Sequence, residues 1–391
     1  MKISATVVLK KGREGSVKRF HPWIFSGAIQ SIEGSPEEGD WVKLIDNWKN
    51  VLGFGHYQIG TITVRVISFL LETPSEELWS AKISTAFQQR ILTGVATQHT
   101  NAYRLIHGEG DGLPGLIVDF YNGVAVMQAH SLGMHKDRMV IAKALKEALG
   151  NSLTAVYYKS QSTLTGKNEN EYLLGMAPVP HVVQEHDNKF YVDWEEGQKT
   201  GFFLDQRENR KRVGELSRNK KVLNTFCYTG GFSVYALMGG ANLVHSVDAS
   251  ERAVDLTNKN IELNGFRAEE HPSFVKDTFD YLKDKKDVYD MIILDPPAFA
   301  KHKEAKHQAM KGYQRLNVEA MRMVKSQGII FTFSCSQVVD RQLFYDTVVS
   351  AAIQAGREIK VLHHLSQPAD HPVSIYHPEG EYLKGLALYV N

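Results

Sequence analysis

The sequence predicts an α/β protein, because strand-like and helix-like segments alternate through its C-terminal half. The predicted strands are short apolar runs at residues 221–226, 243–247, 273–276, 289–294 and 328–333. Helical patterns at residues 250–264 and 313–325 separate some of these runs. Such alternation favours a parallel sheet with helices on both faces, whose ligands bind at the carboxyl ends of the strands.

The first of these strands runs into the loop and helix of KVLNTFCYTGGFSVYA, residues 221–236. Gly230 and Gly231 would let the backbone approach a ligand, and the following helix presents free N–H groups to an electron-rich group. The spacing T-G-G-F is not G-x-G-x-x-G, so the glycines alone are equally consistent with a plain turn. Asp248, however, ends the next strand, where such folds place a carboxylate that binds ribose hydroxyls. Together these features predict a nucleotide-type cofactor site.

Composition narrows the class of protein. A chain of 391 residues is too long for one ordinary core, so two or three domains are expected. Its 43% hydrophobic and 23% charged residues, without a membrane-spanning run or a signal peptide, predict a cytoplasmic protein. The two cysteines, Cys227 and Cys335, form no C-x-x-C, and the 16 histidines form no metal-spaced cluster, so no metal is expected. A net charge of +1 does not by itself indicate a nucleic-acid binder.

Residues 1–70 resemble a small β domain, with strand-like runs at residues 7–9, 41–45, 51–57 and 61–69. The segment between the first two runs interleaves basic residues, among them Lys11, Arg13 and Arg19, with Trp23 and Phe25. This mixture suits phosphate contact combined with base stacking. A solvated basic loop over a small core containing Trp23 and Phe25 is the plainer interpretation of the segment taken alone.

Residues 71–186 are predicted to form an α+β region that orients substrate or serves as scaffold. Helices are expected at residues 78–93 and 136–149, a strand at 153–159, and a hairpin around Asn122-Gly123. The C-terminal domain is expected to span residues 187–391. Near its start, Asp205 and Glu208 have the D-x-x-E spacing of a capping box, ahead of a basic helix.

Two strand ends carry the candidate chemistry. Asp295 follows the strand at residues 289–294, and two prolines after it stiffen the turn. Cys335 stands in F-S-C-S at the end of the next strand along the chain. An isolated cysteine there would more often be a small buried apolar residue. If the two strands are neighbours, however, their ends lie about 5 Å apart, and a thiol and a carboxylate face one substrate.

Such a pair suits methylation of a pyrimidine at carbon-5. Carbon-5 of cytosine or uracil is a poor nucleophile, but addition of a thiolate at carbon-6 moves electron density onto it, which is covalent catalysis. The carboxyl group can hydrogen-bond or protonate ring nitrogen-3 as the adduct forms. The residue that removes the carbon-5 proton is not identified by the sequence.

Seven motifs along the chain carry a resemblance to a known family: HPWIFSGAI, GEGDGLPGLIVD, KTGFFLDQRENR, NTFCYTGGFSV, VDAS, LDPPAFAK and FSCS. They resemble the RlmI (YccW) family of class I S-adenosylmethionine-dependent methyltransferases, which make 5-methylcytosine in large-subunit ribosomal RNA. The resemblance implies a β-barrel PUA domain at residues 1–70, a central α+β domain at 71–186, and a Rossmann-like methyltransferase domain at 187–391.

The resemblance also implies roles for particular residues. It assigns S-adenosylmethionine to the loop from Phe226 through Tyr228 and Gly230 to Gly231, the ribose contact to Asp248, and the adenine side to Asp277. Cys335 and Asp295 become the catalytic pair, whereas Cys227 is expected to pack inside the loop. The predicted RNA-binding residues are Lys11, Arg13, Arg19 and Lys301, the last of these in LDPPAFAK. Ribosomal RNA is the expected partner, with neither membrane nor metal, and a homodimer is left open.

Other functions remain open at this point. The commoner RNA cytosine methyltransferases carry a second cysteine beside the proline after the fourth strand, where this chain has Pro296-Pro297. One alternative is therefore methylation of a purine nitrogen, although related guanine methyltransferases carry asparagines where F-S-C-S stands here. Another is a non-catalytic RNA-binding protein of ribosome assembly. Intact Asp248, Asp295 and Cys335 argue against it.

Overall fold

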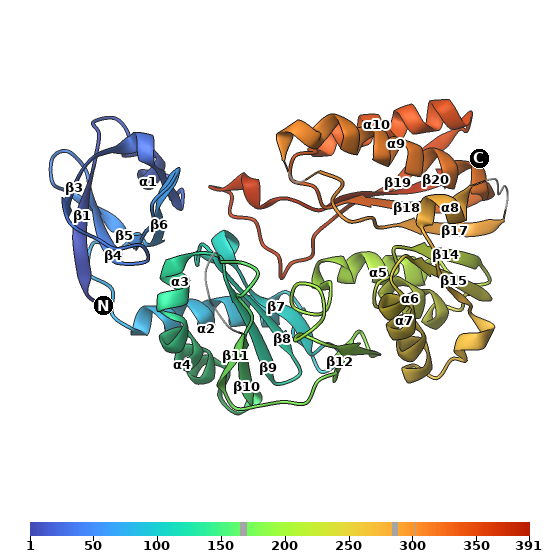
Figure 1. The fold of residues 1–391 in the computed structure, drawn as a ribbon, viewed down its shortest axis with the longest axis horizontal. Helices are drawn as coiled ribbons and strands as arrows, with labels where there is room; N and C mark the ends of the chain where they lie inside the picture. The colour runs from blue at the N-terminus through green and yellow to red at the C-terminus, as the bar shows by residue number, and fades with distance from the viewer. Residues whose placement is uncertain (165–169, 284–287, 301) are drawn as a thin grey trace. The chain divides into compact units, whose positions relative to one another are not determined.

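A computed structural model describes residues 1–164, 170–283, 288–300 and 302–391 as two compact units (Figure 1). The N-terminal unit contains residues 1–181, 192–202 and 369–380. The C-terminal unit contains residues 182–191, 203–368 and 381–391. The N-terminal unit thus includes a short segment from near the end of the chain, which no local sequence signal indicates.

A six-stranded sheet forms the first part of the N-terminal unit, in the order β2-β6-β5-β4-β1-β3. Its strands are β1 (Ile3–Leu9), β2 (Trp23–Phe25), β3 (Ile29–Gly34), β4 (Trp41–Ile45), β5 (Val51–Tyr57) and β6 (Ile62–Ser68). Val64 and Val66 of the last strand lie in the core of this sheet. The helix α1 (Gly15–Lys18) and strands β2 and β3 were not predicted, because all three lie in or beside the basic segment, and α1 and β2 have only four and three residues.

The second part of the N-terminal unit is a five-stranded sheet in the order β11-β10-β9-β8-β7. Its strands are β7 (Ala102–His107), β8 (Leu116–Tyr121), β9 (Val124–Ala129), β10 (Ala155–Tyr158) and β11 (Glu171–Leu174). The helices of this part are α2 (Glu77–Leu92), α3 (Leu132–Lys136) and α4 (Arg138–Leu149). The hairpin predicted at Asn122-Gly123 is confirmed: both residues have positive φ, 44° and 94°, as a tight hairpin turn requires.

Residues 369–380 are attached to this second sheet by buried polar contacts. The carboxylate of Asp370 accepts a hydrogen bond from the backbone N–H of Arg104 at 3.0 Å. The guanidinium of Arg90 donates to the Asp370 carbonyl at 3.0 Å and forms a buried ion pair with Asp111. These bonds join α2 and β7 to a segment more than 260 positions away in the chain.

The C-terminal unit is built on a seven-stranded sheet in the order β16-β15-β14-β17-β18-β20-β19. Its strands are β14 (Lys221–Thr225), β15 (Leu243–Asp248), β16 (Ser273–Val275), β17 (Tyr289–Leu294), β18 (Val324–Ser334), β19 (Ile359–Ser366) and β20 (Lys384–Val390). The first five in this order pair in parallel, and β20 runs antiparallel to both of its neighbours. The predicted parallel sheet is therefore confirmed.

Helices cover both faces of this sheet, with α5, α6 and α7 together on one side and α8, α9 and α10 on the other (Figure 1). They are α5 (Arg207–Glu215), α6 (Gly231–Met238), α7 (Glu251–Leu263), α8 (Thr278–Leu282), α9 (Lys306–Met323) and α10 (Arg341–Ala355). A hairpin of β12 (His181–Glu185) and β13 (Asn188–Val192) precedes them. Helix α9 starts earlier than predicted, because its first turns are mostly polar and lack an apolar period.

Helix ends in this unit follow local capping rules in one case and not in another. Ser250 caps α7 by accepting from the Ala253 N–H, and Gly265, with φ of 84°, follows its last turn. The capping box predicted at Asp205 is wrong. Helix α5 has Gln206 at its N-cap without a side-chain cap, and the Asp205 carboxylate accepts instead from the Tyr382 hydroxyl at 2.7 Å.

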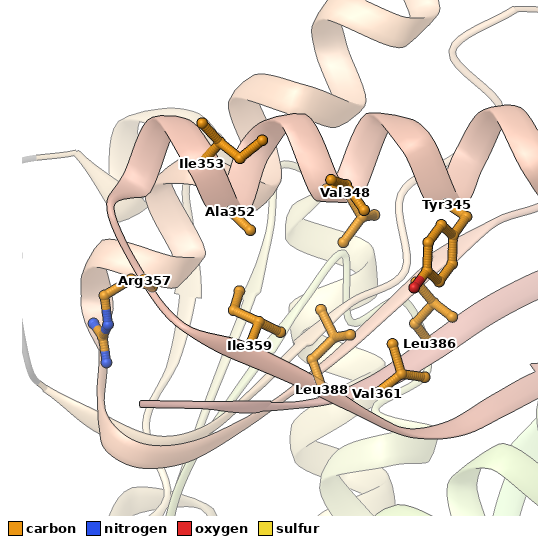
Figure 2. A pocket seen from close by; sticks show the side chains of 10 residues that line it. Tyr345, Val348, Ala352, Ile353, Arg357, Ile359, Val361, Leu386 and Leu388 are labelled. Carbon is orange, nitrogen blue, oxygen red and sulfur yellow. The ribbon is translucent and has the colours of Figure 1, made fainter.

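A cavity of about 190 Å³ lies between α10 and strands β19 and β20. Figure 2 shows Val348 of the helix and Ile359 and Leu388 of the strands pointing into it. Its lining in the described part of the chain holds Arg357 but no carboxylate and no thiol. The cavity is therefore separate from Asp295 and Cys335, which are not among its lining residues.

Candidate active site

The parallel strands bring the predicted site residues of the C-terminal unit to one edge of its sheet. The registers pair Asp248 with Val275, Thr225 with Val247 and Leu294 with Thr332, so β14 to β18 end at similar levels. The residues that follow these ends are Asp277, the loop from Phe226 to Gly231, Asp295 and Cys335. The condition set by the sequence, that β17 and β18 are neighbours, is met.

The predicted cofactor loop has an unusual backbone. Phe226 and Tyr228 have φ of 53° and 46°, a left-handed conformation that costs a non-glycine residue roughly 1–3 kcal/mol and tends to occur at functional sites. The Asp248 carboxylate steadies the loop by accepting from the backbone N–H of Tyr228 at 3.0 Å and of Ser250 at 3.0 Å. A carboxylate has about four acceptor positions, so it can still bind two hydroxyls of a ribose. This donor and acceptor set fits a nucleoside cofactor.

The two glycines of the loop are required for a different reason from the one expected. A Cβ at Gly230, where φ is 71°, would lie 2.7 Å from the Cγ2 of Thr257. One at Gly231 would lie 2.9 Å from the Cδ of Arg210. Both distances are too short, so the packing behind the loop excludes side chains there, whatever ligand lies in front.

Asp277 and Cys227 make contacts that explain their positions without a ligand. Asp277 is exposed and caps α8, since its carboxylate accepts from the Asp280 N–H at 3.1 Å. Cys227 is buried under the loop with its sulfur 3.4 Å from the Thr257 hydroxyl oxygen. Burial raises the pKa of Cys227 to about 12, so this thiol is not a thiolate at neutral pH. This agrees with the prediction that Cys227 packs inside the loop.

Asp295 is half-buried and is held by a glutamine that sequence reasoning missed. The Gln206 amide nitrogen donates to the Asp295 carboxylate at 2.9 Å. Its amide oxygen accepts from the Asn209 side chain at 2.6 Å, and both amides are buried. Gln206 belongs to the KTGFFLDQRENR motif, which was the only available signal for it.

A buried ion pair anchors the segment that supplies Gln206. The Arg210 guanidinium donates to both carboxylate oxygens of Glu185, at 2.8 and 2.7 Å. A third donor of Arg210 reaches the Phe203 carbonyl at 2.8 Å, and the Tyr235 hydroxyl donates to Glu185 at 3.0 Å. The segment before α5 is thereby bound to the hairpin of β12 and β13.

Cys335 is half-buried between two buried serines, each of which ties the strand end to another element. The Ser334 hydroxyl donates to the Tyr313 hydroxyl of α9 at 3.0 Å. The Ser336 hydroxyl donates to the Ala300 carbonyl at 2.7 Å, at the end of the loop that begins with Asp295. The thiol therefore projects from a loop that is fixed on both sides.

Tyr313 links the thiol and the carboxylate electrostatically. Burial, with a smaller contribution from the negative charges of Cys335 and Asp295, raises the pKa of Tyr313 to about 12, against a lowering by the Ser334 hydrogen bond. Both groups therefore lie within electrostatic reach of one hydroxyl, which stays protonated at neutral pH. This is the arrangement that the neighbouring strand ends predict.

The predicted RNA-binding residues Lys11, Arg13 and Arg19 are exposed in the N-terminal unit, and Lys301 lies outside the described residues. Phe25 beside them is 44% exposed, so it does not lie in the small core in which the plainer interpretation of this segment placed it.

Aromatic residues from the distant segment 369–380 adjoin this basic segment. Phe20 and Tyr376, each 50% exposed, have ring centroids 5.4 Å apart. The rings of Trp23 and His377 are 4.3 Å apart. Tyr376 and His377 could not be found from the sequence, because they lie some 350 positions from the basic segment.

Two features are missing from the part of the chain that the structure describes. No group of three or more histidine, cysteine, aspartate or glutamate side chains there could hold a metal ion. None of the helices found there has the length and apolar character needed to cross a membrane.

Known proteins share this fold and much of this sequence. A family model described as S-adenosylmethionine-dependent methyltransferase matches residues 104–374, and one described as a PUA-like domain matches residues 7–69. A solved Streptococcus mutans structure described as a SAM-dependent methyltransferase has a TM-score of 0.83 at 24% identity, with both chains fully covered. Another, described as a methyltransferase complexed with SAH, has a TM-score of 0.84. The fold, the strand-end site and these matches define the chain as an S-adenosylmethionine-dependent methyltransferase.

Full-length relatives narrow this class. A Shigella boydii serotype 4 protein named Ribosomal RNA large subunit methyltransferase I is 38% identical to this chain. The match covers 99% of this chain and 100% of the relative. The protein of that name in Tolumonas auensis is also 38% identical and covers 99% of both chains. The chain belongs to this family, as the sequence motifs predicted.

Proposed function

We propose that this protein methylates carbon-5 of a cytosine in large-subunit ribosomal RNA through a covalent adduct with Cys335. The observation that carries the proposal is the position of Cys335 and Asp295 at the ends of neighbouring parallel strands. The negative charges of both residues raise the pKa of the same hydroxyl, that of Tyr313. The names of the relatives support ribosomal RNA as the substrate. The alternative reaction, methylation of a purine nitrogen, needs no thiol and would therefore give Cys335 no role.

In the proposed reaction, Cys335 is the nucleophile that activates carbon-5. The Cys335 thiolate adds to carbon-6 of the base, forming an S–C bond and moving an electron pair onto carbon-5. S-adenosylmethionine carries a methyl group on a positively charged sulfur. This methyl group is the electrophile that carbon-5 requires. Loss of the carbon-5 proton to a base then restores the ring double bond and releases Cys335 as a thiolate.

Asp295 is proposed to stabilise the ring while the adduct exists. Electron density that enters at carbon-6 also reaches nitrogen-3, where a carboxyl group can donate a hydrogen bond or a proton. The Gln206 amide holds one carboxyl oxygen of Asp295 at 2.9 Å and thereby fixes its direction. The other oxygen is proposed to face the base.

Nucleoside analysis tests this function directly. Purified protein is incubated with S-adenosylmethionine and large-subunit ribosomal RNA from cells that lack this gene, and the RNA is digested for mass spectrometry. The expected product is 5-methylcytidine. A methylated purine would replace the proposal by the nitrogen-methylating alternative, and unchanged RNA with intact RNA binding would support the non-catalytic one.

Asp248→Ala is expected to weaken S-adenosylmethionine binding by roughly 1.5–3 kcal/mol, because hydrogen bonds to a charged acceptor are lost. Calorimetry measures the effect. Asp255→Ala on the outer face of α7, where the carboxylate is 60% exposed, is the matched control and should bind normally. Unchanged affinity in the Asp248 variant would remove it from the cofactor site.

Replacing Lys11, Arg13 and Arg19 together by glutamate is expected to weaken RNA binding and flatten its salt dependence. Each phosphate contact that is lost lowers the slope of log K against log salt by about 0.7–0.9. Filter binding over a salt series measures the slope, and cofactor affinity should stay unchanged. Reversal of the exposed Arg267 in the C-terminal unit serves as the control. An unaltered slope in the triple variant would exclude these residues from the RNA interface.

A further inference from the structure

Lys384 is a buried lysine next to the proposed nucleophile, and neither the motifs nor the comparisons assign it a role. It begins β20, opposite Ser334 of β18, and is only 5% exposed. Its ammonium nitrogen donates to the carbonyl of Ser336, the residue after Cys335, at 2.6 Å. The β18 and β20 pairing therefore brings a positive charge to the loop that carries the thiol.

The charges around Lys384 indicate what it pairs with. Burial lowers the pKa of Lys384 to about 8, and the largest opposing effect is the negative charge of Cys335. Arg341 lowers this pKa, whereas Asp340 and Glu381 raise it less than Cys335 does. In the described part of the chain no carboxylate forms an ion pair with Lys384. Buried lysines are rare unless they are paired, so the sulfur is the natural counter-charge.

We propose that the Lys384 ammonium stabilises the Cys335 thiolate, and so acts as the positioning residue that activates the nucleophile. The inference rests on the proposed function, in which Cys335 is the nucleophile. The step that forms the pair is the loss of the thiol proton: the S–H bond of Cys335 breaks, the sulfur keeps the electron pair and the proton passes to water, while Lys384 is already an ammonium. The same ammonium is in place when the thiolate leaves carbon-6 at the end of the reaction.

The rival interpretation is that Lys384 only holds the Ser336 carbonyl. That bond fixes the loop and would be made equally well by any donor of similar length. It would not change the ionisation of the thiol. A readout of thiolate formation therefore separates the two interpretations, whereas a loss of methyl transfer alone does not.

The test is the rate at which iodoacetamide alkylates Cys335 between about pH 6 and pH 10, followed on the Cys335 peptide by mass spectrometry. Cys227 remains in place, because its burial keeps it unreactive and its peptide is resolved separately. Lys384→Met removes the charge and Lys384→Arg keeps it. Lys325→Met, a half-exposed lysine near the other end of β18, is the control.

The expected result is that Lys384→Met lowers the alkylation rate near pH 7 about tenfold and moves the midpoint up by about one pH unit. Lys384→Arg and Lys325→Met should keep the wild-type profile. The difference should be largest below pH 8 and should shrink at higher pH, because Lys384 itself loses its proton there. A Met variant that binds S-adenosylmethionine normally and has the wild-type profile would overturn the inference.

A second measurement on the unaltered protein guards against a variant that does not fold. Ultraviolet absorbance of the thiolate is followed against pH in the wild type, where the midpoint is expected below about 8.5, the value of an ordinary thiol. A midpoint at or above that value would also overturn the inference. Neither measurement uses methyl transfer. The charge pair can therefore be present even if Cys335→Ser stays active, in which case only the proposed function fails.

Discussion

Cys335→Ser is expected to reduce methyl transfer on the order of 10³-fold or more while S-adenosylmethionine binding stays near the wild-type level. A serine hydroxyl ionises far less readily than a thiol, so no anion is available to add to carbon-6. The fold should persist, because the substitution changes one atom of a half-buried side chain and leaves the bonds of Ser334 and Ser336 in place. Single-turnover kinetics and calorimetry measure the two quantities separately.

Cys227→Ser is the natural control, because this buried thiol packs under the loop and is expected to cause a much milder loss. RNA that contains 5-fluorocytidine at the target adds a second readout. Fluorine at carbon-5 cannot leave as the proton does, so the wild type should be trapped as a covalent complex that depends on Cys335. Methylation by Cys335→Ser at a near wild-type rate, or a trapped linkage on Cys227, would show the mechanism to be wrong and favour the nitrogen-methylating alternative.

Strand ends could be predicted from the sequence because their signals are local. Asp248 and Asp295 each close an apolar run, and Cys335 directly follows one, so their positions follow from the parallel sheet alone. Helix α7 could also be predicted from the sequence, because its apolar period, its Ser250 cap and the glycine after its last turn all indicate the same helix. The roles of these residues in catalysis remain predictions.

Contacts between segments far apart in the sequence could not be predicted. Lys384 reaches the carbonyl of Ser336 across 48 positions, because β20 returns antiparallel beside β18. Gln206 meets Asp295 across 89 positions, and the Asp205 carboxylate was misassigned as a cap because its partner Tyr382 lies 177 positions away. Local spacing carries no information about such partners.

Arg210→Met is expected to destabilise the C-terminal unit by about 3–5 kcal/mol, because it leaves the fully buried Glu185 carboxylate without its partner. Thermal unfolding followed by calorimetry measures this change. At about 2–4 °C per kcal/mol for a unit of this size, the melting transition should fall by roughly 6–20 °C. Binding of S-adenosylmethionine should weaken as well, since Arg210 packs behind Gly231 and anchors the segment that holds Gln206.

Two comparisons separate the buried pair from charge removal in general. Lys259→Met breaks an exposed pair with Asp255 on α7 and should cost less than about 0.5 kcal/mol, because water solvates both groups. Adding Glu185→Gln to Arg210→Met should recover part of the lost stability, since the unpaired buried charge is then gone. If Arg210→Met melts like Lys259→Met, the guanidinium does not anchor the segment before α5, and the fixed orientation of Gln206 and Asp295 needs another explanation.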